Sequence, residues 1–336
     1  MAVGKGESLN GSGLMFTAGI PSPSINSVYL GGFELRFYAL FIILGIAIAT
    51  WLASRRLERR GGARGVVVDI ALWAVPFGIA GGRSYHVITH PNDYFYPGAD
   101  LWRVLYVWEG GLAIFGAVLV GGAAAMIGCR IAGIRFLSFA DALAPAMLIA
   151  QAVGRLGNYF NQELYGLPTT LPWGLQIDPQ SAAFPEGLPP GTIFHPLFLY
   201  EMLWNLAGAA TILLLERRYD LRWGRALGVY LLIYGTGRAW FESIRIDPTE
   251  LEIWGVKINV LTALVVAIAG VVLVVVQAAR HPEPELSVYR QGRSPKTASS
   301  DQESGRTLGS ERQSHRSTFV ASDSDPRVAG DNPPGP

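Results

Sequence analysis

The sequence predicts an all-α protein that crosses a membrane several times, a polytopic bundle of seven transmembrane helices. Half of its 336 residues are hydrophobic and only 16% are charged, whereas ordinary soluble domains carry about 25% charged residues. Seven stretches also approach the roughly 20 apolar residues that a spanning helix needs. The net charge of +1 creates no field that favours nucleic acid. We therefore expect membrane lipids, and not nucleic acid, as partners.

The seven expected spans differ in the charged residues that they contain. Gly110–Cys129 and Ile258–Ala279 contain none, and Phe37–Ala53 is uncharged but slightly short. Charged side chains are costly inside a membrane and often indicate function. The four interrupted spans are Val66–Val87 (Asp69, Arg83), Phe136–Phe160 (Asp141, Arg155), Phe194–Leu215 (Glu201) and Ala226–Ile244 (Arg238, Glu242).

Basic residues between the spans predict the orientation of the bundle. The stretch SRRLERRGGARG after the first span carries five arginines, and the loops predicted on that side carry eleven in all. The loop 161–194, predicted on the other side, contains no Lys or Arg. Because cytoplasmic loops are enriched in basic residues, we expect the N-terminus outside and the C-terminus in the cytoplasm.

Composition divides the chain into three parts. Residues 1–30 are expected to form an extracytoplasmic segment, partly at the membrane interface, and residues 31–280 the seven-helix domain. Residues 281–336 are rich in Ser, Pro, Gly and mixed charge. Such a segment buries too little apolar surface to order itself. It predicts a disordered cytoplasmic tail.

Three arginines are expected in the outer half of the membrane. Arg83, Arg155 and Arg238 lie in spans that run from inside to outside, and each has glycine beside it. An arginine inside a span costs about 3 kcal/mol on insertion scales, whereas its planar guanidinium suits phosphate. We therefore expect a pocket for an anionic lipid headgroup in the outer leaflet. The alternative is a set of structural ion pairs with the available carboxylates, Glu163, Glu201 and Glu242.

Further polar groups are predicted at the same end of the bundle. Asn158 and Asn161 continue the helix face of Arg155, and exposed backbone amides of Gly110 and Gly111 could face a headgroup. Singly, a tyrosine here is more often an interface anchor and a lone histidine a structural group. Together they outline a polar cavity, to which the outer ends of spans one and five add Tyr38, His195, Tyr200 and Glu201.

No metal or cofactor is expected from the sequence. The single cysteine, Cys129, excludes an internal disulfide and a cysteine-rich metal site. The five histidines show no metal-ligand spacing.

The polar motifs resemble the prolipoprotein diacylglyceryl transferases of bacterial plasma membranes. GRLGNYFNQELYG, Gly154–Gly166, is similar to the signature of that family. The supporting matches occur in the family's order and extend the resemblance over about residues 20–279: IPSPSINSVYLGGFELRFYAL, GGRSYHV, WEGGLAIFG, HPLFLYE and YGTGRAWFESIR. It implies a multi-pass enzyme of the bacterial plasma membrane that needs no cofactor.

The resemblance also implies a reaction. The diacylglyceryl group of phosphatidylglycerol passes to the lipobox cysteine of a prolipoprotein signal peptide, a thioether forms, and glycerol 1-phosphate leaves. By motif position, Arg155 and Arg238 hold the phosphate, Glu242 orients Arg238, and Asn158 and Tyr38 complete the catalytic set. The expected phosphatidylglycerol-binding residues are Arg83, Gly110, Gly111, Arg155, Asn161, Glu163, Gly166 and His195.

One position departs from the family's pattern. Many members carry a histidine that is often assigned to thiol activation, where this chain has Phe115. A thiol has a reference pKa near 8.5, which neighbouring arginines lower, so a dedicated base could be dispensable. His195 and His86 are the other candidates.

Two non-enzymatic hypotheses compete with this one. An anion or lipid transporter would need an arginine-lined path that continues into the inner half of the membrane, but spans three and seven are uncharged. A structural scaffold would explain close helix packing but not polar groups gathered at one depth. The enzyme hypothesis is the one that accounts for both features.

Overall fold

The computed structural model describes residues 19–181, 183–246, 252–253 and 255–293. The chain divides into two compact units, Met1–Arg293 and Ser294–Pro336. All the described residues belong to the first unit, and the fold below is the fold of that unit.

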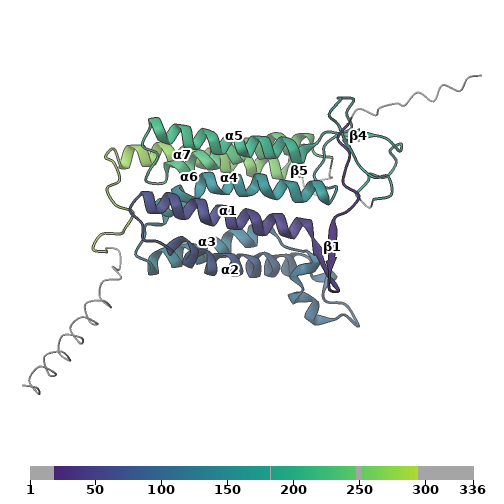
Figure 1. Ribbon diagram of the computed structural model, residues 1–336, viewed down its shortest axis with the longest axis horizontal. Coiled ribbons are helices and arrows are strands. Elements are labelled where there is room, and N and C mark those ends of the chain that lie inside the picture. Colours follow the sequence, from purple (N-terminus) through teal and green to yellow (C-terminus); the bar gives the residue numbers. More distant parts are fainter. Residues whose placement is uncertain (1–18, 182, 247–251, 254, 294–336) are drawn as a thin grey trace, which may run out of the picture. The chain divides into compact units, whose positions relative to one another are not determined.

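Long helices dominate the described residues and lie side by side as a bundle (Figure 1). Six of them, all except α6, are long and apolar enough to cross a membrane, so the prediction of a helical membrane bundle is confirmed. α6 carries Arg225, Arg238 and Glu242, and its passage through the membrane stays a prediction. The helices are α1 (Phe37–Arg59), α2 (Val66–Thr89), α3 (Ile114–Ile131), α4 (Phe136–Phe160), α5 (Leu197–Arg218), α6 (Arg225–Ile244) and α7 (Ile258–Arg280).

Glycines allow the closest helix pairs to approach each other. α2 packs on α3 and α6 packs on α7 along much of their length. A Cβ added at Gly81 of α2 would lie 2.6 Å from the carbonyl oxygen of Gly116 in α3, and one at Gly228 of α6 would lie 2.8 Å from that of Gly270 in α7. Such backbone contact is typical of helix pairs in membranes. α1 and α5 in turn pack against α4.

Short antiparallel strand pairs interrupt the loops, so the all-α prediction holds for the bundle but not for its connections. β1, β4 and β5 lie at the end of the bundle where α1 begins (Figure 1). Three short 3-10 helices also occur in the connection between α2 and α3. The strand pairs are β1 (Ser27–Leu30) with β2 (Phe33–Arg36), β3 (Leu175–Gln176) with β4 (Ile193–Phe194), and β5 (Glu252–Ile253) with β6 (Val256–Lys257).

Two predicted spans begin too early, for reasons of backbone geometry. Gly110 and Gly111 have φ of 92° and 69°, a left-handed conformation that a right-handed helix excludes, so α3 begins only at Ile114. Phe194 pairs with Leu175 in the β3–β4 ladder, and α5 begins at Leu197. The other predicted spans agree with their helices within a few residues, except that α1 continues to Arg59.

The charged residue Asp141 inside α4 has a structural role. It is fully buried, and its carboxylate accepts hydrogen bonds from the backbone N–H groups of Gly224 at 2.7 Å and Leu227 at 2.9 Å. These N–H groups belong to the first turn of α6, which has no partner for them within the helix. Asp141 thus stabilises the start of α6 from the side of α4.

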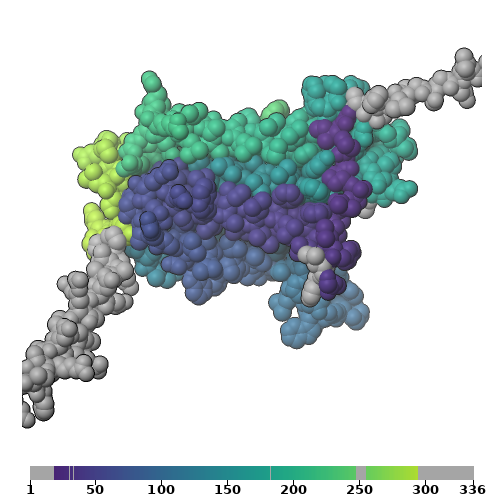
Figure 2. All heavy atoms as spheres, in the orientation of Figure 1, coloured from purple at the N-terminus to yellow at the C-terminus, as the bar shows by residue number. Residues whose placement is uncertain are grey.

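The segment 281–293 packs against the bundle, although the sequence predicted disorder from residue 281. Glu285 is 3% exposed, Val288 1% and Tyr289 7%. The backbone N–H of Arg135 donates to the carbonyl of Val288 at 2.9 Å. In Figure 2 the yellow atoms of this segment cover the end of the bundle opposite β1. The rest of the predicted tail, and residues 1–18 of the predicted N-terminal segment, lie outside the described residues.

Candidate active site

A chain of charged and polar side chains crosses four helices at one end of the bundle. Arg155 Nη2 lies 2.5 Å from Glu201 Oε2, and Glu201 Oε1 lies 3.9 Å from Arg238 Nη1. Arg238 Nη2 lies 2.7 Å from Glu242 Oε2, and Asn259 Nδ2 donates to Glu242 Oε1 at 2.8 Å. Arg155 is thus held by one carboxylate, and Arg238 lies between two.

Helix packing brings these residues together. Arg155 lies in the last two turns of α4, Glu201 near the start of α5, Arg238 and Glu242 near the end of α6, and Asn259 at the start of α7. α4 packs on α5 and α6, and α6 packs on α7. Antiparallel neighbours place the end of one helix beside the start of the next, so residues that are distant in sequence meet.

The carboxylates are buried and the arginines reach the surface. Glu201 is 5% exposed and Glu242 is 3% exposed, whereas the side chains of Arg155 and Arg238 are 27% and 24% exposed. A buried carboxylate needs a charged or hydrogen-bonding partner, and each has one in an arginine. The outer faces of the two guanidinium groups remain available to a ligand.

A cavity of about 600 Å³, called the arginine cavity below, opens beside Arg155 and Arg238. Its volume is in the range of small-molecule sites. Among the described residues that line it, three side chains are cationic and one is anionic, and two of the cations also pair with the buried carboxylates. The lining residues are Arg155, Asn158, Glu163, Leu164, Tyr165, Ala183, Arg238 and Arg245.

The loop after α4 has an unusual backbone that forms one wall of this cavity. Gln162 and Leu164 have φ of 56° and 61°, a conformation that L residues rarely adopt and that often marks a functional site. The Gln162 side chain stabilises it, donating to the carbonyl of Pro23 at 3.1 Å and accepting from the N–H of Asp178 at 2.9 Å. The loop thereby directs residues 163–165 toward the cavity.

Gly166 and His195 are not among the residues that line the cavity. The N–H of Gly166 donates to the carbonyl of His195 at 2.9 Å, and a Cβ at Gly166 would lie 2.8 Å from the carbonyl oxygen of Ile244. His195 Nδ1 lies 3.3 Å from Tyr200 Oη. Gly166 therefore allows close packing between the loop and the end of α6.

Tyr38 and Asn161 lie near the cavity without lining it. A Cβ added at Gly157 would lie 2.8 Å from Tyr38 Cδ2, so the tyrosine ring packs on α4 one residue before Asn158. Asn161 is the C-cap of α4, and its N–H donates to the carbonyl of Gly157 at 3.1 Å.

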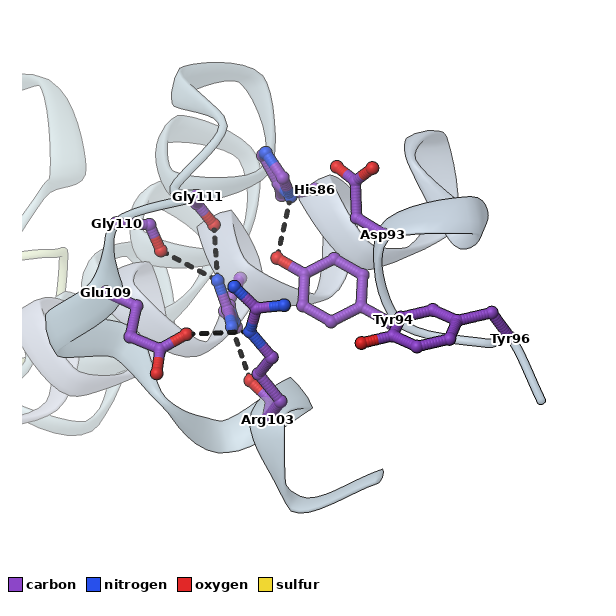
Figure 3. Close-up of a pocket in the computed structure, with 9 residues that line it drawn as sticks. His86, Asp93, Tyr94, Tyr96, Arg103, Glu109, Gly110 and Gly111 are labelled. Carbon is purple, nitrogen blue, oxygen red and sulfur yellow. Dashed lines mark hydrogen bonds and ion pairs between the residues drawn. The ribbon is translucent and has the colours of Figure 1, made fainter. Parts of the chain in front are cut away.

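The structure does not bring Arg83 together with Arg155 and Arg238. Arg83, Gly110 and Gly111 line a second cavity of about 420 Å³ between α2 and the loop before α3 (Figure 3). The Arg83 guanidinium donates its hydrogen bonds to backbone carbonyls. Gly110 and Gly111 therefore face it with their carbonyl groups and not with their N–H groups. Arg83 donates to the carbonyls of Val104 at 2.8 Å, Gly110 at 2.7 Å, Gly111 at 3.3 Å and Arg103 at 2.5 Å.

Several side chains that line this second cavity bind one another. His86 Nδ1 lies 3.1 Å from Tyr94 Oη, and the two side chains point toward each other in Figure 3. Glu109 accepts a hydrogen bond from Arg103 at 2.8 Å and raises the pKa of that arginine. Phe115, which occupies the position of the family histidine, is 57% exposed and lines neither cavity. Neither His86 nor His195 lines the arginine cavity.

Two partners of Glu242 were missed in the sequence. Arg245 lines the cavity, and its Nη1 lies 4.0 Å from Glu242 Oε2. Its spacing of three residues from Glu242 could have revealed it. Asn259 lies at the start of an uncharged span and belongs to none of the motifs recognised in the sequence.

The fold and the cavity together define the class of protein, a multi-pass membrane protein with an arginine-lined polar cavity at one end of its helices. More narrowly, the chain belongs to the prolipoprotein diacylglyceryl transferase family, whose model matches residues 26–276.

Curated relatives carry the same family name. The chain is 52% identical to the phosphatidylglycerol–prolipoprotein diacylglyceryl transferase of Leifsonia xyli, over 86% of this chain and 90% of the relative. It is 49% identical to the second such enzyme of Streptomyces coelicolor (83% and 87%) and 47% identical to that of Paenarthrobacter aurescens (78% and 84%).

Proposed function

We propose that this chain transfers the diacylglyceryl group of phosphatidylglycerol to the lipobox cysteine of prolipoproteins. The relatives are named for this lipid and for prolipoprotein substrates. The observation that carries the proposal is the cavity in which Arg155 and Arg238 are held by buried carboxylates and face a space large enough for a headgroup.

The geometry suits a displacement at carbon with a phosphate leaving group. The thiolate sulfur forms a bond to the glycerol carbon of the diacylglyceryl group, and the bond from that carbon to the phosphate oxygen breaks. Negative charge grows on the departing oxygen. Fixed cations at that position stabilise the transition state more than the ground state, and Arg155 and Arg238 supply them. Asn158, whose Oδ1 lies 3.3 Å from Arg155 Nη1, helps to orient Arg155.

The thiol proton needs an acceptor, and we assign that role to Glu163. Among the described residues that line the arginine cavity, it is the one carboxylate. The neighbouring arginines lower the pKa of a bound thiol, so the proton passes more easily from the thiol to a carboxylate. In this assignment Glu163 takes the role that is often given to the family histidine, whose position Phe115 occupies in this chain.

The proposed topology places the arginine cavity in the outer leaflet. The loops that join α1 to α2, α3 to α4 and α5 to α6 lie at the other end of these helices and carry the basic residues that favour the cytoplasm. In this arrangement all seven helices span the plasma membrane, lipid enters from the side, and the signal peptide presents its cysteine at the outer surface.

A transfer assay tests the proposal. The purified protein is placed in phosphatidylglycerol vesicles with a lipobox peptide, and mass spectrometry measures the peptide that has gained a diacylglyceryl group. Transfer is expected with the native chain and not with Arg155→Ala or with a peptide in which serine replaces the cysteine. Movement of lipid across the bilayer without transfer would instead support the transporter hypothesis.

A further inference from the structure

Glu201 contacts both arginines of the cavity, but unequally. Its Oε2 lies 2.5 Å from Arg155, whereas its Oε1 lies 3.9 Å from Arg238. The residue is 5% exposed, and Oε1 is buried and accepts no hydrogen bond from the described residues. One oxygen therefore makes a firm ion pair, and the other has only a long contact.

The two arginines have their closest contacts with different carboxylates. Arg155 is held by Glu201, and Arg238 is held by Glu242 at 2.7 Å. Glu242 is in turn fixed by Asn259. The longest contact in the series is thus the one between Glu201 and Arg238, where a single carboxylate serves both guanidinium groups.

We propose that Glu201 is a positioning residue that sets the spacing of the two arginines and competes with the phosphate for Arg238. Without a carboxylate between them, two guanidinium groups repel each other. A phosphate has acceptor oxygens for both, so it can replace the long contact of Glu201 without disturbing the short one. When the phosphate leaves, Oε1 is in place to attract Arg238 again.

This arrangement has a consequence for turnover. A free phosphate monoester that binds the two arginines must compete with Glu201, so the carboxylate weakens product binding while keeping the arginines in place. Removing its charge is expected to strengthen the binding of the product and to slow the reaction. A carboxylate that merely stabilises the fold would produce no gain in product affinity.

Glu216 provides a matched control at the other end of α5. It also serves two arginines, with contacts of 2.6 Å and 2.7 Å to Arg56 and 2.6 Å to Arg60. It belongs to the same helix but lies away from the arginine cavity. Glu216→Gln therefore reports the effect of removing a shared carboxylate on stability alone.

The experiment compares the native chain, Glu201→Gln and Glu216→Gln, all purified in detergent. Calorimetry measures the binding of sn-glycerol 1-phosphate, the transfer assay measures turnover, and thermal unfolding measures stability. We expect Glu201→Gln to bind the phosphate monoester about tenfold more tightly, which corresponds to about 1.4 kcal/mol, and to turn over more slowly. Glu216→Gln should melt earlier with unchanged affinity.

Equal or weaker binding of sn-glycerol 1-phosphate by folded Glu201→Gln would overturn the inference. If that variant is not recovered folded, Glu201→Asp takes its place, because the shorter side chain loses the long contact to Arg238 first and the same gain is expected. The inference rests on the proposed function. A native chain that transfers no lipid refutes that function, whereas transfer without the gain in affinity refutes only the role of Glu201.

Discussion

Arg238 and Glu242 lie one turn apart on α6, and their side chains meet at 2.7 Å with the carboxylate 3% exposed. A pair at this spacing on an exposed helix contributes only a few tenths of a kcal/mol. Here the carboxylate is buried and is fixed by a second helix through Asn259. The pair therefore directs the guanidinium of Arg238 toward the cavity instead of contributing mainly to helix stability.

Asn259 is expected to matter for turnover although it does not line the cavity. In Asn259→Ala, Glu242 loses the hydrogen bond at 2.8 Å that holds it, and Arg238 loses its fixed orientation. Hydrogen bonds to charged groups contribute about 1.5–3 kcal/mol, so we expect turnover to fall by about tenfold or more. Asn259→Gln should recover part of it. Full turnover in Asn259→Ala would show that α7 has no part in orienting the site.

Arg83 is expected to act on stability, because its guanidinium is bound by four backbone carbonyls. Arg83→Lys keeps the charge but cannot reach all of them, so the melting temperature should fall. Protein that remains folded should keep its KM for phosphatidylglycerol. A raised KM with an unchanged melting temperature would return Arg83 to the lipid-binding residues.

Glu163 is expected to determine the rate through the thiol proton. Loss of a general base typically costs a factor of about 10²–10⁴, so Glu163→Gln should lose roughly a hundredfold in turnover with a cysteine peptide. A selenocysteine peptide, whose selenol is already ionised at neutral pH, should react almost equally with both proteins. If the variant loses the same factor with both peptides, Glu163 does not accept the proton.

The C-terminal residues before and after Arg293 are expected to differ in their contribution to stability. Removing residues 294–336 should leave both turnover and stability unchanged. Removing everything after Pro284 also removes Glu285, Val288 and Tyr289, which are buried, and burial of a single large apolar side chain contributes about 2 kcal/mol. We therefore expect a clearly lower melting temperature for the shorter chain. Equal melting curves for the two truncations would contradict the packing of this segment.

The sequence predicts what depends on local pattern and misses what depends on tertiary contacts. Apolar runs locate the seven α-helices of the described residues, and α4 agrees with its predicted span at both ends. Depth in the membrane groups Arg83 with Arg155, because both lie toward the outer ends of their predicted spans. It cannot show that α2 packs on α3 and that backbone carbonyls occupy the guanidinium of Arg83.

The C-terminal segment and Glu201 also depend on tertiary contacts that the sequence does not specify. Residues 281–293 have a composition typical of disorder, but a few of them find partners on the loops between helices, as when Tyr289 Oη accepts from the N–H of Ala63 at 2.9 Å. In the sequence, Glu201 is a charge inside a span, a candidate for a structural ion pair and one of the polar groups expected around the cavity. Its unequal sharing between two arginines is a matter of distances, which no sequence pattern specifies.

Arg155 gives the sharpest test of the proposed chemistry. Its contacts with Glu201 at 2.5 Å and Asn158 at 3.3 Å fix a planar guanidinium beside the cavity. Lysine keeps the charge but lacks the paired donors. We expect Arg155→Lys to lose much of its turnover and Arg155→Ala to lose nearly all, since the loss of one donor to a developing charge costs about 3 kcal/mol, or roughly a hundredfold in rate.

The measurement must separate catalysis from folding, because Glu201 is buried and would be left without its close partner in Arg155→Ala. Arg155→Lys keeps a cation beside Glu201, so its melting temperature in detergent should stay near that of the native chain while its turnover falls. A structural arginine would give the reverse, with low yield, early melting and normal turnover in the protein that folds. Full turnover in a stable Arg155→Lys variant would remove Arg155 from the chemistry, since nothing in the paired-donor geometry would then be needed.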